Sequence, residues 1–159
     1  MDFIWSPWRY TYVSSAADSD SCVFCLDDTR ADDEERLVLY RGEHSFVIMN
    51  LYPYTSGHLM VAPYAHVASI TGMEPEQMHE LLGLGRRSVE ALEATYSPEG
   101  FNLGMNLGAC AGAGVRDHVH LHVVPRWCGD VNFMTVTGEA RVLPEDLHTS
   151  FRKLKPLFA

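Results

Sequence analysis

The sequence predicts one α+β domain with an antiparallel sheet of about five strands, a long helix and a C-terminal helix. Three observations support this fold class. Strand-like apolar runs outnumber helical stretches, most connections between them are short, and one long stretch places its apolar residues at helical spacing. A length of 159 residues suits a single core. We divide the domain into an N-terminal arm at 1–21, a core at 22–134 and a C-terminal extension at 135–159.

The predicted strands are short apolar runs bounded by turn residues. A third run ends at Pro63, after a loop at 51–57 that carries Pro53 and Gly57. The runs after residue 100 alternate apolar and polar residues, which is typical of a strand with one buried face. In chain order, we expect strands at 37–40, 45–50, 58–62, 101–107 and 118–124, and a weaker strand at 133–136.

Two helices are predicted. Residues 75–96 carry apolar residues at steps of three and four, which form one stripe, and Pro75 suits the first turn of a helix. Residues 144–157 are expected to form the terminal helix. The stripe of the first helix is Met78, Leu81, Leu82, Gly85, Val89, Leu92 and Tyr96.

Composition and charge exclude several classes of function. The chain is 47% apolar and 21% charged, and no run approaches the roughly 20 apolar residues of a membrane span. The first residues, 1–5, lack the basic and apolar regions of a secretory signal, so we expect a cytoplasmic protein. A net charge of −9 argues against nucleic acid as the main partner, since phosphate contacts need clustered Lys and Arg. One small nucleotide remains compatible with this charge.

The most informative motif is a row of three histidines at 118–124, His-Val-His-Leu-His-Val-Val. On a strand, His118, His120 and His122 point to one face and the residues between them point to the core. A loop with three glycines, at 108–114, directly precedes the row. Such a loop lets backbone N–H groups approach phosphate oxygens. A single strand histidine is usually a hydrogen-bond partner, but three in register beside a glycine loop favour catalysis.

Imidazole chemistry suits phosphoryl or nucleotidyl transfer. Neutral imidazole is a good nucleophile near pH 7, and it can attack phosphorus to form a phosphoramidate. A neighbouring imidazolium can stabilise the phosphoryl oxygens or protonate the leaving oxygen. The sequence shows no magnesium motif, so positioning and fixed dipoles would carry the reaction.

The histidine row resembles the HxHxHxx signature of the histidine triad (HIT) superfamily of nucleotide hydrolases and transferases. The stretch at 50–61 is similar to the nucleoside-pocket strand of that family, and 102–108 is similar to its substrate-facing strand. The stretches at 5–10 and 125–133 resemble a narrower branch that includes bacterial diadenosine tetraphosphate phosphorylases. The resemblance runs from about residue 3 to residue 134.

The resemblance implies roles for individual residues. The middle histidine, His120, would be the nucleophile, and His122 would contact the phosphoryl oxygens or the leaving group. The first, His118, would be a structural or metal-side residue. Asn50 matches a position that hydrogen-bonds the ribose, and Asn106 matches an asparagine close to the phosphate.

The glycine loop supplies two further candidate substrate-binding residues, Gly112 and Gly114. Several hydrolase branches carry a Gln or Ser four residues before the triad, and that side chain touches phosphate. Gly114 stands at this position here, so a backbone N–H would take over that contact. The resemblance also implies a homodimer and a purine nucleotide substrate, with no organic cofactor.

A CxxC motif at Cys22 and Cys25 has a spacing common among zinc ligands. In some HIT relatives such a pair holds a structural zinc together with two histidines, which would here be His58 and His118. Four protein ligands leave no open position for water, so this zinc would be structural. The alternative is a reduced pair without metal, with His58 as a hydrogen-bond partner. His44, His66, His79 and His148 are interpreted as solvated surface histidines.

The sequence leaves three alternatives for function. The enzyme releases AMP as a hydrolase or ADP as a phosphorylase, depending on whether water or phosphate is the acceptor. A nucleotide-binding regulator with little turnover is the second reading. A metal-binding module built on the cysteines and histidines is the third.

Overall fold

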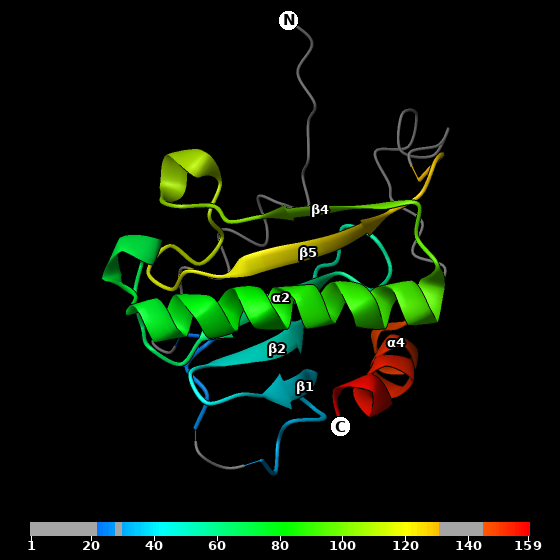
Figure 1. The fold of residues 1–159 in the computed structure, drawn as a ribbon, viewed down its shortest axis with the longest axis horizontal. Coiled ribbons are helices and arrows are strands. Elements are labelled where there is room, and N and C mark those ends of the chain that lie inside the picture. The colour runs from blue at the N-terminus through cyan, green and yellow to red at the C-terminus, as the bar shows by residue number, and fades with distance from the viewer. Residues whose placement is uncertain (1–21, 28–29, 131–144) are drawn as a thin grey trace, which may run out of the picture.

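Five antiparallel strands form one sheet in the order β1-β2-β3-β5-β4 in the computed structural model of this chain, which describes residues 22–27, 30–130 and 145–159 (Figure 1). The predicted fold class is confirmed. No helix in these ranges is long and apolar enough to cross a membrane. The strands are β1 (Val38–Arg41), β2 (Ser45–Met49), β3 (Leu59–Pro63), β4 (Gly100–Gly104) and β5 (Leu121–Arg126), and the α-helices are α2 (Pro75–Tyr96) and α4 (Leu147–Leu154).

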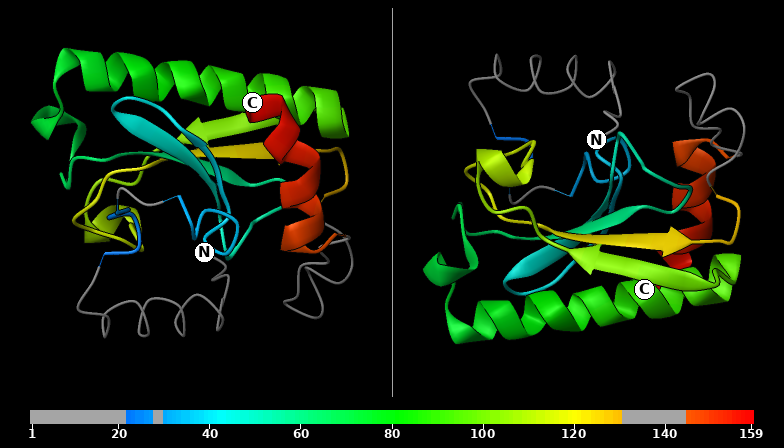
Figure 2. Two further views of the ribbon diagram at one scale, coloured as in Figure 1. Left: turned by 90° about the horizontal axis from the view of Figure 1, so that it is seen from below. Right: turned by 90° about the horizontal axis from the view of Figure 1, so that it is seen from above.

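The long helix α2 lies across one face of the sheet, and α4 lies near the C-terminal end of α2 (Figures 1 and 2). Helix α2 begins with a capping box, in which the Gln77 side chain accepts a hydrogen bond from the Glu74 backbone N–H at 3.0 Å. Its stripe differs from the prediction at Leu82, whose side chain is 54% exposed. The buried stripe runs instead through Leu81, Leu84, Gly85, Ser88, Ala91 and Leu92, which turns Leu82 outward.

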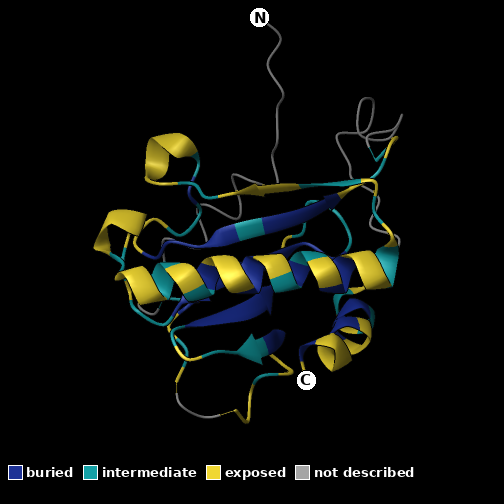
Figure 3. Ribbon diagram, viewed as in Figure 1, coloured by how far each residue is buried: buried dark blue, intermediate teal, exposed yellow. Residues whose placement is uncertain are grey.

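The two faces of the sheet bury different sets of residues, and β2 and β5 are largely buried in Figure 3. The face under α2 holds the main apolar core, to which alternate residues of β2, β3 and β5 contribute. The opposite face holds a smaller apolar cluster formed by Phe24, Val38, Phe46, Ile48, Met60 and Ala62. The second face is therefore covered partly by the segment around Phe24, and it is the face on which the histidines lie.

Several element boundaries differ from the predictions. Strand β5 begins at Leu121 rather than at residue 118, and β4 ends at Gly104 rather than at residue 107. The β4–β5 ladder ends at the pair of Gly104 and His122, where β4 ends, while Leu121 of β5 is still paired with Val61 of β3. The C-terminal helix starts after Asp146, whose carboxylate accepts the backbone N–H of Thr149 at 2.9 Å as an N-cap.

Three short 3-10 helices within the described ranges were not anticipated: η1 (Ile70–Gly72), η2 (Ala109–Ala111) and η3 (Lys155–Phe158). The second of them lies inside the predicted glycine loop, and the third continues α4. The predicted arm at 1–21 and the weaker strand at 133–136 lie outside the described residues.

Candidate active site

The three histidines of the row lie together at the start of β5, on the face of the sheet opposite α2. The ring centroids of His120 and His122 are 4.8 Å apart, and all three rings are shielded from solvent to different degrees. Val119 is buried, and Leu121 and Val123 belong to the core under α2. The alternation expected for a strand thus extends back to His118, although the ladder itself begins at Leu121.

The environment of His120 leaves one ring nitrogen as a nucleophile. Its Nδ1 lies 2.9 Å from the carbonyl oxygen of His118, and a carbonyl only accepts, so Nδ1 carries the proton. In the neutral ring, Nε2 then holds the free lone pair. Burial lowers the pKa of His120, although the hydrogen bond to His118 acts in the opposite direction. The imidazole is therefore neutral and nucleophilic at pH 7.

His122 is held in the opposite tautomer by His58. The backbone N–H of Tyr54 donates to His58 Nδ1 at 3.2 Å, so that nitrogen is an acceptor and the His58 proton is on Nε2. His58 Nε2 lies 2.9 Å from His122 Nδ1, to which it donates. The proton of neutral His122 is then on Nε2. His122 thus presents an N–H donor at Nε2, and His120 presents a lone pair at Nε2.

Asn50 supports this arrangement from the end of β2. Its side-chain oxygen accepts the backbone N–H of Tyr52 at 2.9 Å, and its amide nitrogen lies 3.3 Å from His58 Nδ1. The side chain is 9% exposed. In this structure Asn50 shapes the loop at 51–57 and contacts His58, while its predicted contact with ribose stays a prediction.

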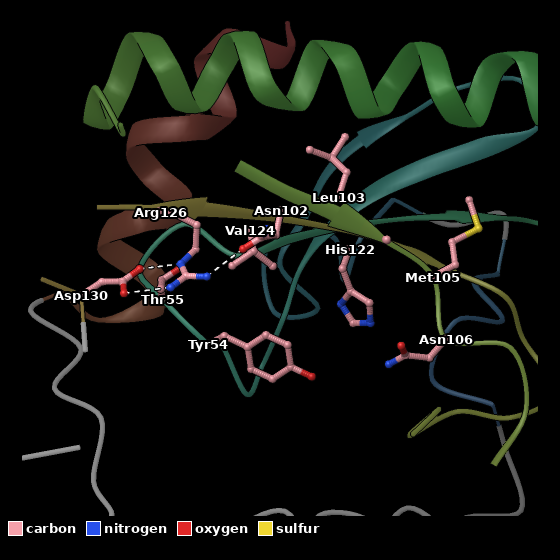
Figure 4. A pocket seen from close by; sticks show the side chains of 11 residues that line it. Tyr54, Thr55, Asn102, Leu103, Met105, Asn106, His122, Val124, Arg126 and Asp130 are labelled. Atoms are coloured by element: carbon pink, nitrogen blue, oxygen red, sulfur yellow. Dashed lines mark hydrogen bonds and ion pairs between the residues drawn. The ribbon is translucent and has the colours of Figure 1, made fainter. Parts of the chain in front are cut away.

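A cleft of about 310 Å³ opens beside His122, between β4 and the loop that follows β2 (Figure 4). Tyr54 and Thr55 form one wall, and Asn102, Asn106 and neighbouring residues of β4 form the other. In Figure 4 the His122 ring points into the cleft toward the side of Tyr54 and Asn106. A volume of this order accommodates a nucleotide-sized group next to His122.

Arg126 closes the far end of this cleft. Its guanidinium forms a bidentate ion pair with Asp130, with contacts of 2.5 and 2.9 Å, and donates to the Asn102 side-chain oxygen at 2.7 Å. Residues His122, Val124 and Arg126 all line the cleft, as expected for alternate residues of one strand. The sequence had predicted no role for four residues of this lining, Tyr54, Thr55, Arg126 and Asp130. Only for Arg126 was a signal available, because the alternation of the strand continues beyond the triad to this residue.

The glycine loop lies at the other end of the cleft. Asn106 lines the cleft and its amide donates to the Gly112 carbonyl at 3.4 Å. Gly108 and Gly112 flank η2 with φ angles of 84° and 85°, a conformation that favours glycine. Gly114 is half-buried, close to His118 in sequence. The phosphate contacts predicted for Asn106, Gly112 and Gly114 stay predictions.

A second cluster lies next to the row, formed by Cys22, Cys25, His66 and His118. One ligand atom from each residue lies within 4.8 Å of all the others. Cys22 Sγ is 3.4 Å from His118 Nδ1, and Cys25 Sγ is 3.3 Å from His66 Nδ1 and 3.9 Å from His118 Nδ1. The predicted pairing of both cysteines with His118 is therefore present.

The fourth member differs from the prediction, since His66 takes the place expected for His58. These histidines stand before and after β3, whose five residues span about 16 Å. Strand β5 runs antiparallel to β3, so His118 at its start meets the end of β3, near His66. His122 meets the beginning of β3, near His58. His58 consequently belongs to the active site, and His66, interpreted from sequence as a surface histidine, belongs to the cysteine cluster.

The donor set fits a tetrahedral zinc. With Zn–S near 2.3 Å and Zn–N near 2.0–2.1 Å, tetrahedral geometry separates the ligand atoms by about 3.3–3.8 Å. His118 Nε2 lies 2.8 Å from the Pro63 carbonyl and so carries the proton, which leaves Nδ1 free to face the cysteines. Burial lowers the pKa of His118, and the nearby His66 and His120 act in the same direction. A neutral imidazole with a backbone partner is the form that ligates metal.

Comparisons with known proteins agree with this geometry. The model of the HIT domain family matches residues 32–128. AP-4-A phosphorylase of Mycobacterium tuberculosis (strain ATCC 25618 / H37Rv) is 37% identical, over 95% of this chain and 81% of that protein. The asymmetrical bis(5'-nucleosyl)-tetraphosphatase of Schizosaccharomyces pombe is 33% identical, over 56% of this chain and 48% of that protein. A Zn-bound histidine triad family protein from Mycobacterium smegmatis superposes with a TM-score of 0.63 at 26% identity, covering 93% of this chain and 91% of that one.

Proposed function

Because this chain belongs to the histidine triad (HIT) family, as its sequence predicted, we propose that it transfers nucleotidyl groups through a covalent bond to His120, with diadenosine tetraphosphate or a similar dinucleoside polyphosphate as substrate. The observation that carries the mechanism is the pair of opposite tautomers on His120 and His122. The 37% identical phosphorylase favours inorganic phosphate as the acceptor.

In the first step the lone pair on His120 Nε2 attacks the α-phosphorus of the substrate. The N–P bond forms while the bridging P–O bond breaks, and the electron pair leaves with the oxygen of the departing nucleotide. His122 Nε2–H donates a hydrogen bond to that oxygen or to the phosphoryl group, which stabilises the developing negative charge while the proton stays on His122. Attack at an α-phosphorus of diadenosine tetraphosphate releases ATP and leaves an adenylyl group on His120.

In the second step an oxygen of the acceptor attacks the same phosphorus. The N–P bond breaks and its electron pair returns to His120 Nε2, while any proton on the attacking oxygen passes to solvent. Phosphate as acceptor releases ADP, and water releases AMP. Covalent catalysis thus divides one transfer into two displacements, with His120 as the nucleophile in the first and as the leaving group in the second.

Product analysis tests the proposal. We expect ADP and ATP from diadenosine tetraphosphate only when phosphate is present. AMP and ATP in both conditions would identify a hydrolase with the same covalent step. Binding of AMP without any product, under conditions where the protein is folded, would contradict the proposed enzyme and support the regulator.

We further propose that Cys22, Cys25, His66 and His118 hold a structural zinc, which the ligand distances and the proton on His118 Nε2 support. Protein purified without chelators is expected to contain about one zinc per chain by elemental analysis. His66→Asn should lose the metal, and the matched variant His58→Asn should keep it. The reverse result would restore the ligand set expected from sequence. Cys128→Ser, at an exposed cysteine outside the cluster, serves as the control for Cys25→Ser.

A homodimer is proposed as well, with β4 as the contact. Strand β4 lies at the edge of the sheet, and its Leu103 and the following Leu107 are 50% and 40% exposed. An exposed strand edge with apolar neighbours favours pairing with another strand. Light scattering after gel filtration should give the mass of a dimer, and Leu103→Glu should lower it to that of the monomer.

A further inference from the structure

Phe24 lies between the two cysteines of the CxxC motif and touches the nucleophile. Its side chain is 3% exposed, and its ring centroid is 4.7 Å from that of His120 and 5.5 Å from that of His118. The same ring belongs to the smaller apolar cluster with Phe46 and Met60. Phe24 therefore links the metal cluster, the apolar cluster and the nucleophile.

The metal cluster joins three separate segments around this contact. Cys22 and Cys25 come from the loop that carries Phe24, His66 follows β3, and His118 precedes β5. Without a metal, Cys22 and Cys25 meet these histidines through weak contacts of sulfur with nitrogen at 3.3–3.9 Å. Coordination would hold the Phe24 backbone on both sides and so fix where its ring lies.

Among the described residues, three directional contacts orient the His120 ring. Nδ1 is held by the His118 carbonyl at 2.9 Å, one side of the ring faces His122 with an interplanar angle of 70°, and Phe24 packs against the ring with a tilt of 38°. A single hydrogen bond at Nδ1 narrows the side-chain torsions of His120 without fixing the tilt of the ring. Packing by Phe24 restricts this tilt and so keeps Nε2 in line for attack, where small displacements are costly for rate.

We propose that Phe24 is a positioning residue that couples the Cys22–Cys25–His66–His118 metal cluster to His120, so that metal binding orders the nucleophile. The proposal rests on the proposed function, because the step it accelerates is nucleotidyl transfer to His120. It adds that the structural metal raises the rate of the covalent step and has very little effect on nucleotide affinity.

The test compares Phe24→Leu with Phe46→Leu, both in the zinc-loaded protein. Phe46 is a matched control, since it is fully buried in the same apolar cluster and stacks on Tyr64 rather than on a histidine. Phe24→Leu is expected to slow single-turnover formation of nucleotidyl-His120 about tenfold while KM changes by less than about twofold. Phe46→Leu should leave the single-turnover rate within about twofold.

Removal of zinc supplies the second arm. In the natural protein, zinc removal should slow the covalent step about tenfold, whereas Phe24→Leu should lose no more than about twofold on zinc removal, because the coupling residue is already gone. Zinc affinity, measured by competition with a chromophoric chelator, should be similar in both variants. Equal slowing of the two leucine variants, or an undiminished zinc effect in Phe24→Leu, would overturn the proposal.

A readout independent of turnover separates this inference from the proposed function. In zinc-loaded protein labelled with ¹⁵N-histidine, His120 should show one tautomer protonated at Nδ1, with sharp ring signals. Phe24→Leu should broaden these signals or mix the tautomers, and Phe46→Leu should not. Unchanged His120 signals in Phe24→Leu would refute the positioning role. Absence of any nucleotidyl intermediate in the natural protein would refute the proposed function, with the ring signals still deciding the role of Phe24.

Discussion

The two faces of the sheet divide stability and chemistry between alternate residues of the same strands. On the α2 face, Val61, Leu121 and Val123 join a continuous apolar core. On the other face, His120 and His122 lie beside a smaller apolar cluster and an open cleft. Consecutive residues of β5 therefore contribute in turn to the apolar core and to the candidate active site. The proposed chemistry therefore depends on polar contacts outside the main core, those of His120 with the His118 carbonyl and of His122 with His58.

The largest effect on activity is expected from a substitution at His120. His120→Gly removes the nucleophile, and we expect nucleotidyl transfer to fall by about a thousandfold or more. Because the ring lies outside the main core, the thermal midpoint should change by only a few degrees. Near-normal turnover in the folded variant would remove His120 from the mechanism.

The adjacent residue should show the opposite pattern. Leu121 is 4% exposed in the α2 core, so Leu121→Ala should lower the free energy of unfolding by about 2–5 kcal/mol. Its kcat/KM, measured well below the unfolding transition, should stay within a few-fold of the natural protein. Urea denaturation and steady-state kinetics on the same preparations check both statements, and a loss of activity without loss of stability would contradict the division of faces.

A smaller effect on activity is expected at the His58–His122 contact, on the face of the sheet that carries the histidines. His58→Leu removes the donor that fixes the His122 tautomer, and we expect kcat to fall about ten- to hundredfold. His58→Gln offers an amide N–H at a similar reach and should recover part of that loss. Equal activity of the two variants would show that the tautomer of His122 is set in another way.

The smallest effect is expected at the end of α2, where Tyr96 donates to Glu145 at 2.6 Å. Burial and this hydrogen bond raise the pKa of Tyr96 to about 12. A folded-state pKa above the unfolded value of about 10 means that the contribution to stability is complete below pH 10 and is lost as pH rises toward 12. The thermal midpoint should fall more between pH 9 and 12 in the natural protein than in Tyr96→Phe. Parallel curves would contradict the shift.

Local spacing in the sequence predicted the helices and strands, and the resemblance to the histidine triad signature predicted His120 as the nucleophile. Periodicity alone placed the helix at 75–96 where the structure has it, and the triad together with its flanking motifs indicated the HIT family. Alternation also separated His120 and His122 from Leu121. Each of these predictions uses residues that are close together in the sequence, so it requires no knowledge of which strands pair in the sheet.

Tertiary structure alone decided which distant residues meet. The resemblance gave His58 as the zinc ligand and left His66 at the surface, whereas the antiparallel register of β3 and β5 brings His58 to His122 and His66 to the cysteines. The contact of Phe24 with His120 likewise needs the cysteine loop to fold over the sheet. Local spacing fixes the direction in which a side chain points, whereas the strand ends that come together are set by packing across the sheet.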